Sequence, residues 1–103
     1  MSRKDDIKAE RIIADHIKTV VFILNEKIVP SNLGHGYVLR RLIRRALRYA
    51  RLIDLNEDGL NEVAKKIIEI YKETYDGLKK KELFILDELK KENEKFEKTL
   101  TSG

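Results

Sequence analysis

Apolar residues recur three and four positions apart along most of this 103-residue chain, the spacing that places them on one face of an α-helix. One proline and five glycines leave few points at which a helix must break. Because 42% of the residues are hydrophobic and 39% are charged, we expect a folded domain with a heavily solvated surface. The pattern predicts an all-α fold, a small bundle of about four helices, approximately residues 6–26, 37–53, 57–75 and 81–99.

The predicted breaks between these helices contain residues that favour turns. Pro30 disfavours helix in the residue before it, so a loop is expected over residues 28–36, with Ser and Asn side chains available for local capping. Asn56 is a suitable N-cap for the third helix. An Asp-Gly pair at 76–77 predicts the end of that helix, and residues 78–81 are expected to form a short basic linker.

Two of the helices show where the core is expected. In the first, residues 20–24 are apolar all round, which indicates burial on several sides by more partners than this chain provides. In the fourth, Glu88, Glu92 and Glu94 are assigned to the flanks. The apolar residues of this fourth helix are Leu83, Ile85, Leu86, Leu89, Phe96 and Leu100.

Composition excludes several classes of site. The chain has no cysteine, hence no disulfide and no thiolate metal site. Its two histidines, His16 and His35, are far apart in the sequence, so no metal is expected. The first residues are polar and no apolar run approaches about 18 residues, so we expect neither a signal peptide nor a membrane span, and a cytoplasmic protein. The length predicts a single domain over residues 1–103.

The net charge of +4 conceals an asymmetry along the chain. Residues 1–53 hold 12 Lys or Arg against 5 Asp or Glu, whereas residues 54–103 hold 10 against 13. All eight arginines lie in the first part. Arginine presents a planar set of donors that matches phosphate, whereas lysines among glutamates mainly keep a helix soluble. We therefore expect an anionic partner to bind the first half of the chain.

Six arginines fall within twelve consecutive positions of the predicted second helix. At 100° per residue they occupy an arc of roughly 140° opposite the apolar face. Pairs four residues apart repel each other by about a few tenths of a kcal/mol, and Asp54 is the nearby carboxylate that offsets this. Phosphate binding, and hence a nucleic-acid partner, is one interpretation; a solvated or internally paired face and an anionic membrane surface are the others. The six are Arg40, Arg41, Arg44, Arg45, Arg48 and Arg51.

Several segments carry a more specific pattern. They read RIIADH at 11–16, PSN at 30–32, GYVLRRLIRRALR at 36–48, and ELFILDELKKE and FEKTL within 82–100. In these segments the chain resembles the middle, tRNA-recognition region of bacterial-type alanyl-tRNA synthetases. The resemblance covers nearly the whole chain and is weaker over residues 52–81.

The resemblance implies binding to the acceptor stem of alanine tRNA and reading of a G·U wobble pair within it. The shallow minor groove of A-form RNA exposes the guanine 2-amino group of such a pair, from which an Asn carbonyl oxygen can accept. Asn32 of the PSN motif is the candidate reader, although its residue type also fits an Asx-turn or a helix cap. The other candidate RNA-binding residues are Ser31, His35 (where the family commonly has Arg), Arg40, Arg41, Arg44, Arg45 and Arg48.

Much of the resembled enzyme would lie outside these residues. In the family, the class II catalytic domain that binds ATP and alanine precedes this region, and its motifs are not found in the sequence. We therefore expect a tRNA-recognition segment of a larger synthetase that is catalytically inactive alone and holds no cofactor itself. Its expected partners are the acceptor stem of alanine tRNA and the other domains of the parent enzyme. The family's second base reader, an Asp in a Tyr-Asp-Thr-Tyr-Gly-type motif, also lies downstream.

An alternative interpretation is a structural segment that docks the catalytic and downstream domains through its arginines, with little RNA binding of its own. It predicts apolar surface left bare around residues 22–24. Asp15 and His16, which belong to the resembled motif, are expected to form a buried, hydrogen-bonded structural pair. The four tyrosines are expected to pack helices.

Overall fold

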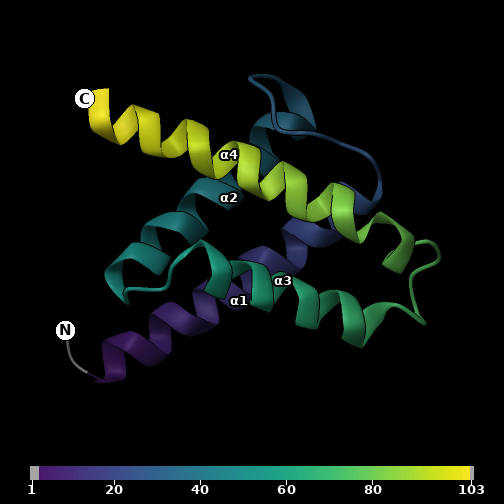
Figure 1. Ribbon diagram of the computed structural model, residues 1–103, viewed down its shortest axis with the longest axis horizontal. Helices are drawn as coiled ribbons and strands as arrows, with labels where there is room; N and C mark the ends of the chain where they lie inside the picture. The colour runs from purple at the N-terminus through teal and green to yellow at the C-terminus, as the bar shows by residue number, and fades with distance from the viewer. Residues whose placement is uncertain (1–2, 103) are drawn as a thin grey trace.

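The computed structural model describes the backbone of residues 3–102 and the side chains of residues 4–101. The described residues form four α-helices and one short 3₁₀-helix, without any strand. In Figure 1, α4 crosses over α2 as it returns from the connection that follows α3. The predicted all-α bundle of four helices is confirmed. The elements are α1 (Arg3–Asn25), α2 (Gly34–Leu52), α3 (Glu57–Tyr71), the 3₁₀-helix η1 (Lys79–Lys81) and α4 (Glu82–Ser102).

The helix boundaries differ from the prediction mainly around the turns. α2 already begins at Gly34, after Leu33, whose extended backbone (φ −133°) makes it the N-cap residue. α3 ends at Tyr71 because the chain turns there, with the N–H groups of Thr74 and Tyr75 both donating to the Tyr71 carbonyl. Most of the predicted basic linker before α4 is the 3₁₀-helix η1.

All four helices contribute to one core. α1 packs against α2 and α3, and α4 packs against the same two helices and, over a smaller contact, against α1. The C-terminal part of α1 is buried on several sides, as its apolar residues predict. The largest fully buried apolar side chains are Ile13, Ile17, Val20, Val21, Leu24, Leu39, Ile43, Ile68, Leu78 and Ile85.

The bare apolar surface expected around residues 22–24 is not found, and that expectation is wrong. Leu24 is fully buried. The Phe22 ring stacks on Tyr75 with 4.6 Å between ring centroids and meets the edge of Tyr71 at 5.2 Å. These two tyrosines therefore cover the end of α1, a contact between residues about 50 positions apart that helical periodicity does not reveal.

The orientation of α4 also corrects the prediction. Leu83 and Leu100, both expected in the core, are 81% and 50% exposed. Glu92, expected on a flank, is only 1% exposed. The buried stripe contains Ile85, Leu89, Glu92 and Phe96, positions that repeat at four and three residues and so share one face of the helix.

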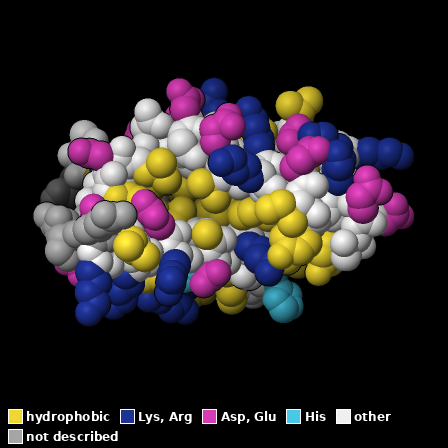
Figure 2. Space-filling view, turned by 90° about the horizontal axis from the view of Figure 1, so that it is seen from below, with side chains coloured by type: hydrophobic (Ala, Val, Ile, Leu, Met, Phe, Trp, Pro, Cys, Tyr) yellow, Lys and Arg dark blue, Asp and Glu magenta, His cyan; other side chains and the backbone are white. Residues whose placement is uncertain are grey.

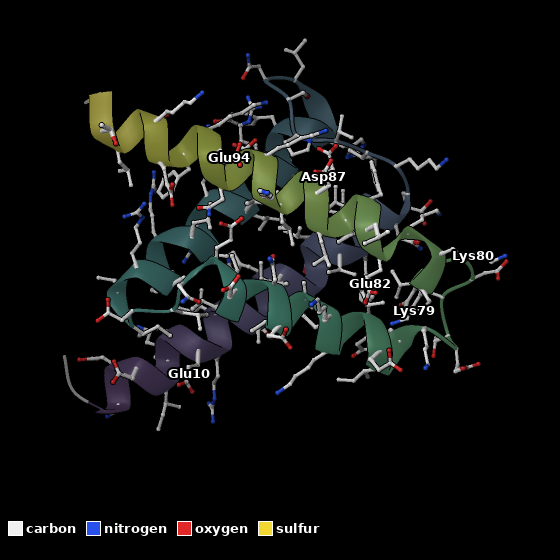
Figure 3. All side chains as sticks on the ribbon, viewed as in Figure 1. Glu10, Lys79, Lys80, Glu82, Asp87 and Glu94 are labelled. Carbon is white, nitrogen blue, oxygen red and sulfur yellow. The ribbon has the colours of Figure 1, made fainter. Side chains whose placement is uncertain are left out.

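Ionic contacts brace the connection between α3 and α4. Lys79 contacts Glu69 at 3.1 Å and Glu82 at 3.3 Å, and Figure 3 shows Lys80 pointing away from the bundle at the same turn. The Lys81 ammonium donates to the carbonyl of Asn25 at 2.7 Å. Because this carbonyl lies at the C-terminus of α1, the bond both satisfies a helix-end acceptor and ties α1 to the start of α4.

The surface is not uniformly charged. In Figure 2, hydrophobic side chains form a band along the middle of one face, with lysines, arginines and acidic residues at its edges. Within the described part of the chain, no helix combines the length and the hydrophobicity needed to cross a membrane.

Two leucines of α4 provide a direct test of its orientation. Replacing the buried Leu89 by Ala should lower the free energy of unfolding by about 2–5 kcal/mol, because it removes core contacts and leaves a cavity. Replacing the exposed Leu83 by Ala should change it by less than about 0.5 kcal/mol. Urea unfolding followed by circular dichroism measures both. Equal losses in the two variants would contradict this orientation of α4.

Candidate nucleic-acid interface

Four of the six arginines of α2 are exposed, as the predicted polar arc requires, whereas Arg40 and Arg44 are partly buried against α4. Leu39, Ile43, Ala46 and Ala50 of α2 point into the core. The structure divides the arginines into two groups, which the sequence does not distinguish. We call Arg40 and Arg44, which donate to α4, the α4 flank, and Arg41, Arg45 and Arg48, which are exposed, the open flank. Arg51, near the end of α2, is exposed but lies 3.8 Å from Glu97 of α4 and belongs to neither group.

The α4 flank is organised by the buried carboxylate of Glu92. Its Oε1 accepts a hydrogen bond from Nε of Arg40 at 3.2 Å, and its Oε2 accepts one from Nε of Arg44 at 2.8 Å. A carboxylate that is 1% exposed needs such charged donors to offset its desolvation. The shared carboxylate also offsets the repulsion between two arginines four residues apart, a task that the sequence assigned to Asp54.

Sequence reasoning missed Glu92, although a signal for it exists. An acidic residue that continues the apolar spacing of Ile85, Leu89 and Phe96 must be buried with them if the helix packs on that face. A buried carboxylate in turn requires a cation, and the arginines of α2 are the densest source in the chain. By contrast, Glu94 of the same helix is exposed and lies on its outer side (Figure 3).

A second residue of α4, Phe96, contacts three arginines of α2 through its aromatic ring. The guanidinium carbons of Arg44, Arg48 and Arg51 lie 6.0, 6.0 and 5.7 Å from the centre of its ring. Cations at this distance from an aromatic ring are attracted by its π-electrons. Phe96 therefore restrains Arg44 and Arg51, and also Arg48, which borders both flanks.

The open flank forms a basic groove of about 680 Å³. Arg41 lies over the Tyr37 ring at 5.8 Å, and Arg45 over the Tyr49 ring at 6.0 Å, which keeps the guanidinium groups extended along the surface. Arginines interleaved with aromatic rings are typical of surfaces that bind nucleic acid. The groove is lined by Tyr37, Arg41, Arg44, Arg45, Arg48, Tyr49 and Leu52.

Asn32 lies in the loop before α2 and is connected to the α4 flank. Its Oδ1 accepts a hydrogen bond of 2.6 Å from Nη1 of Arg40. The residue is exposed. The N-cap of α2 is Leu33, and no side-chain hydrogen bond caps this helix, so the capping role considered for Asn32 is not adopted.

The neighbouring candidates Ser31 and His35 differ in how the structure uses them. The Ser31 hydroxyl donates to the carbonyl of Leu33 at 3.0 Å, and the Ser31 N–H donates to the carbonyl of Gly36 at 3.1 Å. Ser31 thus holds the loop against the first turn of α2. His35 is exposed on that same turn. RNA contacts of either residue remain predictions.

Close packing of the loop on α2 depends on Gly36. A Cβ atom at this position would lie 2.1 Å from the Ser31 hydroxyl oxygen and 2.6 Å from the carbonyl oxygen of Val29. Both distances are far below van der Waals contact, and the second involves backbone that cannot swing away. Glycine is therefore required for the loop carrying Asn32 to lie where it does.

His16 of α1 is electrostatically coupled to the open flank. Partial burial and the positive charge of Arg45 lower the pKa of the His16 imidazole below its usual value. Asp15, its expected partner in a buried pair, is exposed, so that expectation is wrong. Successive helix positions point about 100° apart, so the two side chains diverge. Among residues 3–102, no three His, Asp or Glu side chains come together as a metal site.

Comparison with known proteins identifies the relatives of the chain. A family model described as class II (A) tRNA synthetases matches residues 2–103. The alanine–tRNA ligase of Borrelia hermsii is 50% identical over 101 residues, which are 96% of this chain and 17% of that enzyme. That of Bacillus subtilis is 43% identical over 102 residues, 97% of this chain and 12% of the enzyme. The chain thus spans less than a fifth of the length of these relatives. No solved structure matches it.

The requirement for Gly36 leads to a stability prediction. Gly36→Ala should lower the free energy of unfolding by about 1–3 kcal/mol, because the added methyl group displaces Ser31 and the backbone at Val29. His35→Ala, one residue earlier and exposed, should cost less than about 0.5 kcal/mol. Thermal and urea unfolding of the two variants measure the difference. A Gly36→Ala variant as stable as the parent would argue against the close packing.

The coupling of His16 to Arg45 is testable by titration. Arg45→Ala should raise the pKa of His16, because it removes a positive charge that disfavours the imidazolium form. NMR titration of the imidazole protons measures the shift. Arg41→Ala removes the same charge at another position of the open flank and serves as the control. The prediction fails if Arg45→Ala moves the His16 pKa no more than Arg41→Ala does.

Proposed function

The chain belongs to the class II tRNA synthetase family, and from this membership we propose that it is the acceptor-stem-binding segment of an alanine–tRNA ligase. The observation that carries the proposal is the open flank of α2, a basic groove with aromatic rings, on the same helix whose Arg40 donates to Asn32 of the preceding loop. RNA backbone is the ligand that fits this combination of guanidinium groups and aromatic surface.

We infer a division of labour within this surface. Arg41, Arg45 and Arg48 are exposed and can donate to phosphate oxygens of the acceptor stem. Arg40 and Arg44 already donate to Glu92, so a phosphate would compete there with a buried carboxylate. Their proposed contribution is therefore mainly a fixed positive electrostatic field beside the groove, which Arg44 also lines.

Asn32 is the proposed reader of a base edge. A G·U pair presents the guanine 2-amino donor in the shallow minor groove of A-form RNA, and the Asn carbonyl oxygen is a suitable acceptor. The side chain is exposed in the loop that packs on the first turn of α2, where its carbonyl oxygen accepts from Arg40. RNA recognition would combine phosphate contacts from the arginines, which position the RNA, with one contact from Asn32, which reads a base.

The relatives are named for joining alanine to tRNA, and the part proposed for this chain in such a reaction is binding. The ATP used by the parent enzyme would be held outside these residues. The other proposed partners are the acceptor stem of alanine tRNA and the remaining domains of the enzyme. These assignments are proposals because the chain corresponds to less than a fifth of the relatives' length.

A second candidate function is domain docking. The hydrophobic band of Figure 2 favours it, since such surface is suited to contact with another folded unit. The pairing of Arg40 and Arg44 inside the bundle also reduces the number of arginines available to RNA. In this case the open flank would make no specific contribution to RNA binding.

RNA binding and its salt dependence test the proposed function. A hairpin with the alanine acceptor-stem sequence should bind the chain, and its affinity should fall steeply with salt because bound counterions are released. Replacing both Arg41 and Arg45 by Ala should reduce the slope of log affinity against log salt by about 1.4–1.8, which corresponds to two phosphate contacts. Fluorescence anisotropy at several salt concentrations gives the slope.

A charge-matched control separates this surface from net charge. Replacing Lys66 and Lys80 by Ala removes two exposed positive charges from α3 and η1 and should leave the slope nearly unchanged. Equal effects of the two double variants would mean that binding is diffuse. A chain that binds no hairpin at low salt would favour the docking function.

A further inference from the structure

Three hydrogen bonds connect α4, α2 and the Asn32 loop in series. Glu92 accepts from Nε of Arg44 and from Nε of Arg40, and Nη1 of the same Arg40 donates to Oδ1 of Asn32. Arg40 thus contacts a buried carboxylate with one nitrogen and an exposed amide with another. A residue of α4 is in this way linked to the candidate base reader, although the two lie in different elements of the fold.

The chemistry of arginine determines how the Asn32 amide is oriented. A guanidinium group has only donors, so the amide atom that faces it must be the oxygen and not the NH₂ group. Without such a partner the two ends of an exposed amide interchange freely by rotation about χ2. The bond of Arg40 therefore selects one of two orientations of the Asn32 side chain.

Glu92 in turn determines where Arg40 points. The Nε bond to Oε1 fixes the plane of the Arg40 guanidinium, which directs Nη1 toward Asn32. Glu92 itself is immobilised by burial and by its second bond, to Arg44. The position of the Asn32 side chain thus depends on the packing of α4 against α2.

We propose that Glu92 and Arg40 are positioning residues that hold the Asn32 carboxamide in the orientation used for RNA recognition, an inference that rests on the proposed function. The carbonyl oxygen has two lone pairs, so the bond from Arg40 leaves one for a donor on a base. By holding Arg40 and Arg44, Glu92 also withholds two cations from non-specific phosphate contacts. The glutamate therefore favours selectivity and lowers general affinity.

Two variants break different hydrogen bonds of the series that joins Glu92, Arg40 and Asn32. Glu92→Gln replaces one acceptor oxygen by an NH₂ group, so Arg40 or Arg44 loses its partner. Arg40→Lys keeps the positive charge but has a single nitrogen in place of the two separated donors. Glu94→Gln makes the same change in charge on the exposed side of α4, and Arg51→Lys makes the same replacement at an exposed position near the end of α2 that is not among the proposed RNA contacts. The last two are the controls.

The first experiment uses the chain without RNA. NMR relaxation of the Asn32 side-chain amide should show a restricted group in the parent and in both controls, and a more mobile one in Glu92→Gln and Arg40→Lys. Circular dichroism verifies that each variant is folded, and Arg40→Lys tests the idea even if the loss of the buried carboxylate unfolds the other variant. An Asn32 amide that is equally ordered in Arg40→Lys would overturn the proposal.

The second experiment measures selectivity with two hairpins that differ only at the guanosine of the G·U pair, replaced in one by inosine, which lacks the 2-amino group. The parent should prefer guanosine by about three- to tenfold, the effect of one hydrogen bond. This preference should disappear in Glu92→Gln and Arg40→Lys and persist in the controls. Glu92→Gln should also bind both hairpins more tightly, with a salt slope larger by about 0.7–0.9 for each arginine released.

The two experiments separate the possible failures. A preference for guanosine that survives when the Asn32 amide has become mobile would overturn the positioning role. A parent that binds both hairpins equally would contradict base reading by Asn32 in the proposed function, while the relaxation data would still decide whether Arg40 orients the amide. Lower affinity of Glu92→Gln for both hairpins would contradict the idea that Glu92 withholds arginines from phosphate.

Discussion

The orientation of the arginines between α2 and α4 depends on the buried carboxylate of Glu92, which accepts from Arg40 and Arg44. Removing a carboxylate from water is costly unless charged donors replace the solvent, and Arg40 and Arg44 supply these from adjacent turns of α2. The same carboxylate screens the repulsion between them. An apolar residue at this position would pack α4 equally well. It would orient neither the guanidinium groups nor the Asn32 side chain.

The two hydrogen bonds to Glu92 divide the arginine-rich arc of α2 into two surfaces with different properties. On the α4 flank, hydrogen bonds to Glu92 and the nearby Phe96 ring restrain the arginines. On the open flank, Arg41 and Arg45 lie over tyrosine rings that, like them, line the groove. The restrained arginines of the α4 flank and the exposed arginines of the open flank thus lie side by side on α2. This arrangement is suited to orienting a polyanion as well as attracting it.

Local features of the fold were predictable because they depend on residues close together in the chain. Apolar spacing predicts all four helices, and Asn56 caps α3 by accepting from the N–H of Gly59, as its residue type suggests. The failures that matter most for the surface concern contacts between distant residues, whereas the wrong expectation for Asp15 concerns the exposure of a single side chain. Tyr75 covers Phe22, and Glu92 lies in the apolar stripe of α4, whereas a rule that assigns every glutamate to solvent places it on a flank.

By itself, the sequence determines the helical class, the arc of arginines opposite the apolar face of α2, and the loop that carries Asn32, since helix periodicity and turn residues act over a few positions. It also matches the family model of class II tRNA synthetases over residues 2–103. Only the tertiary structure decides which arginines are engaged and how Asn32 is oriented. The reason is that the deciding carboxylate is 52 residues from Arg40 in the chain, and the packing of α4 on α2 brings it into contact.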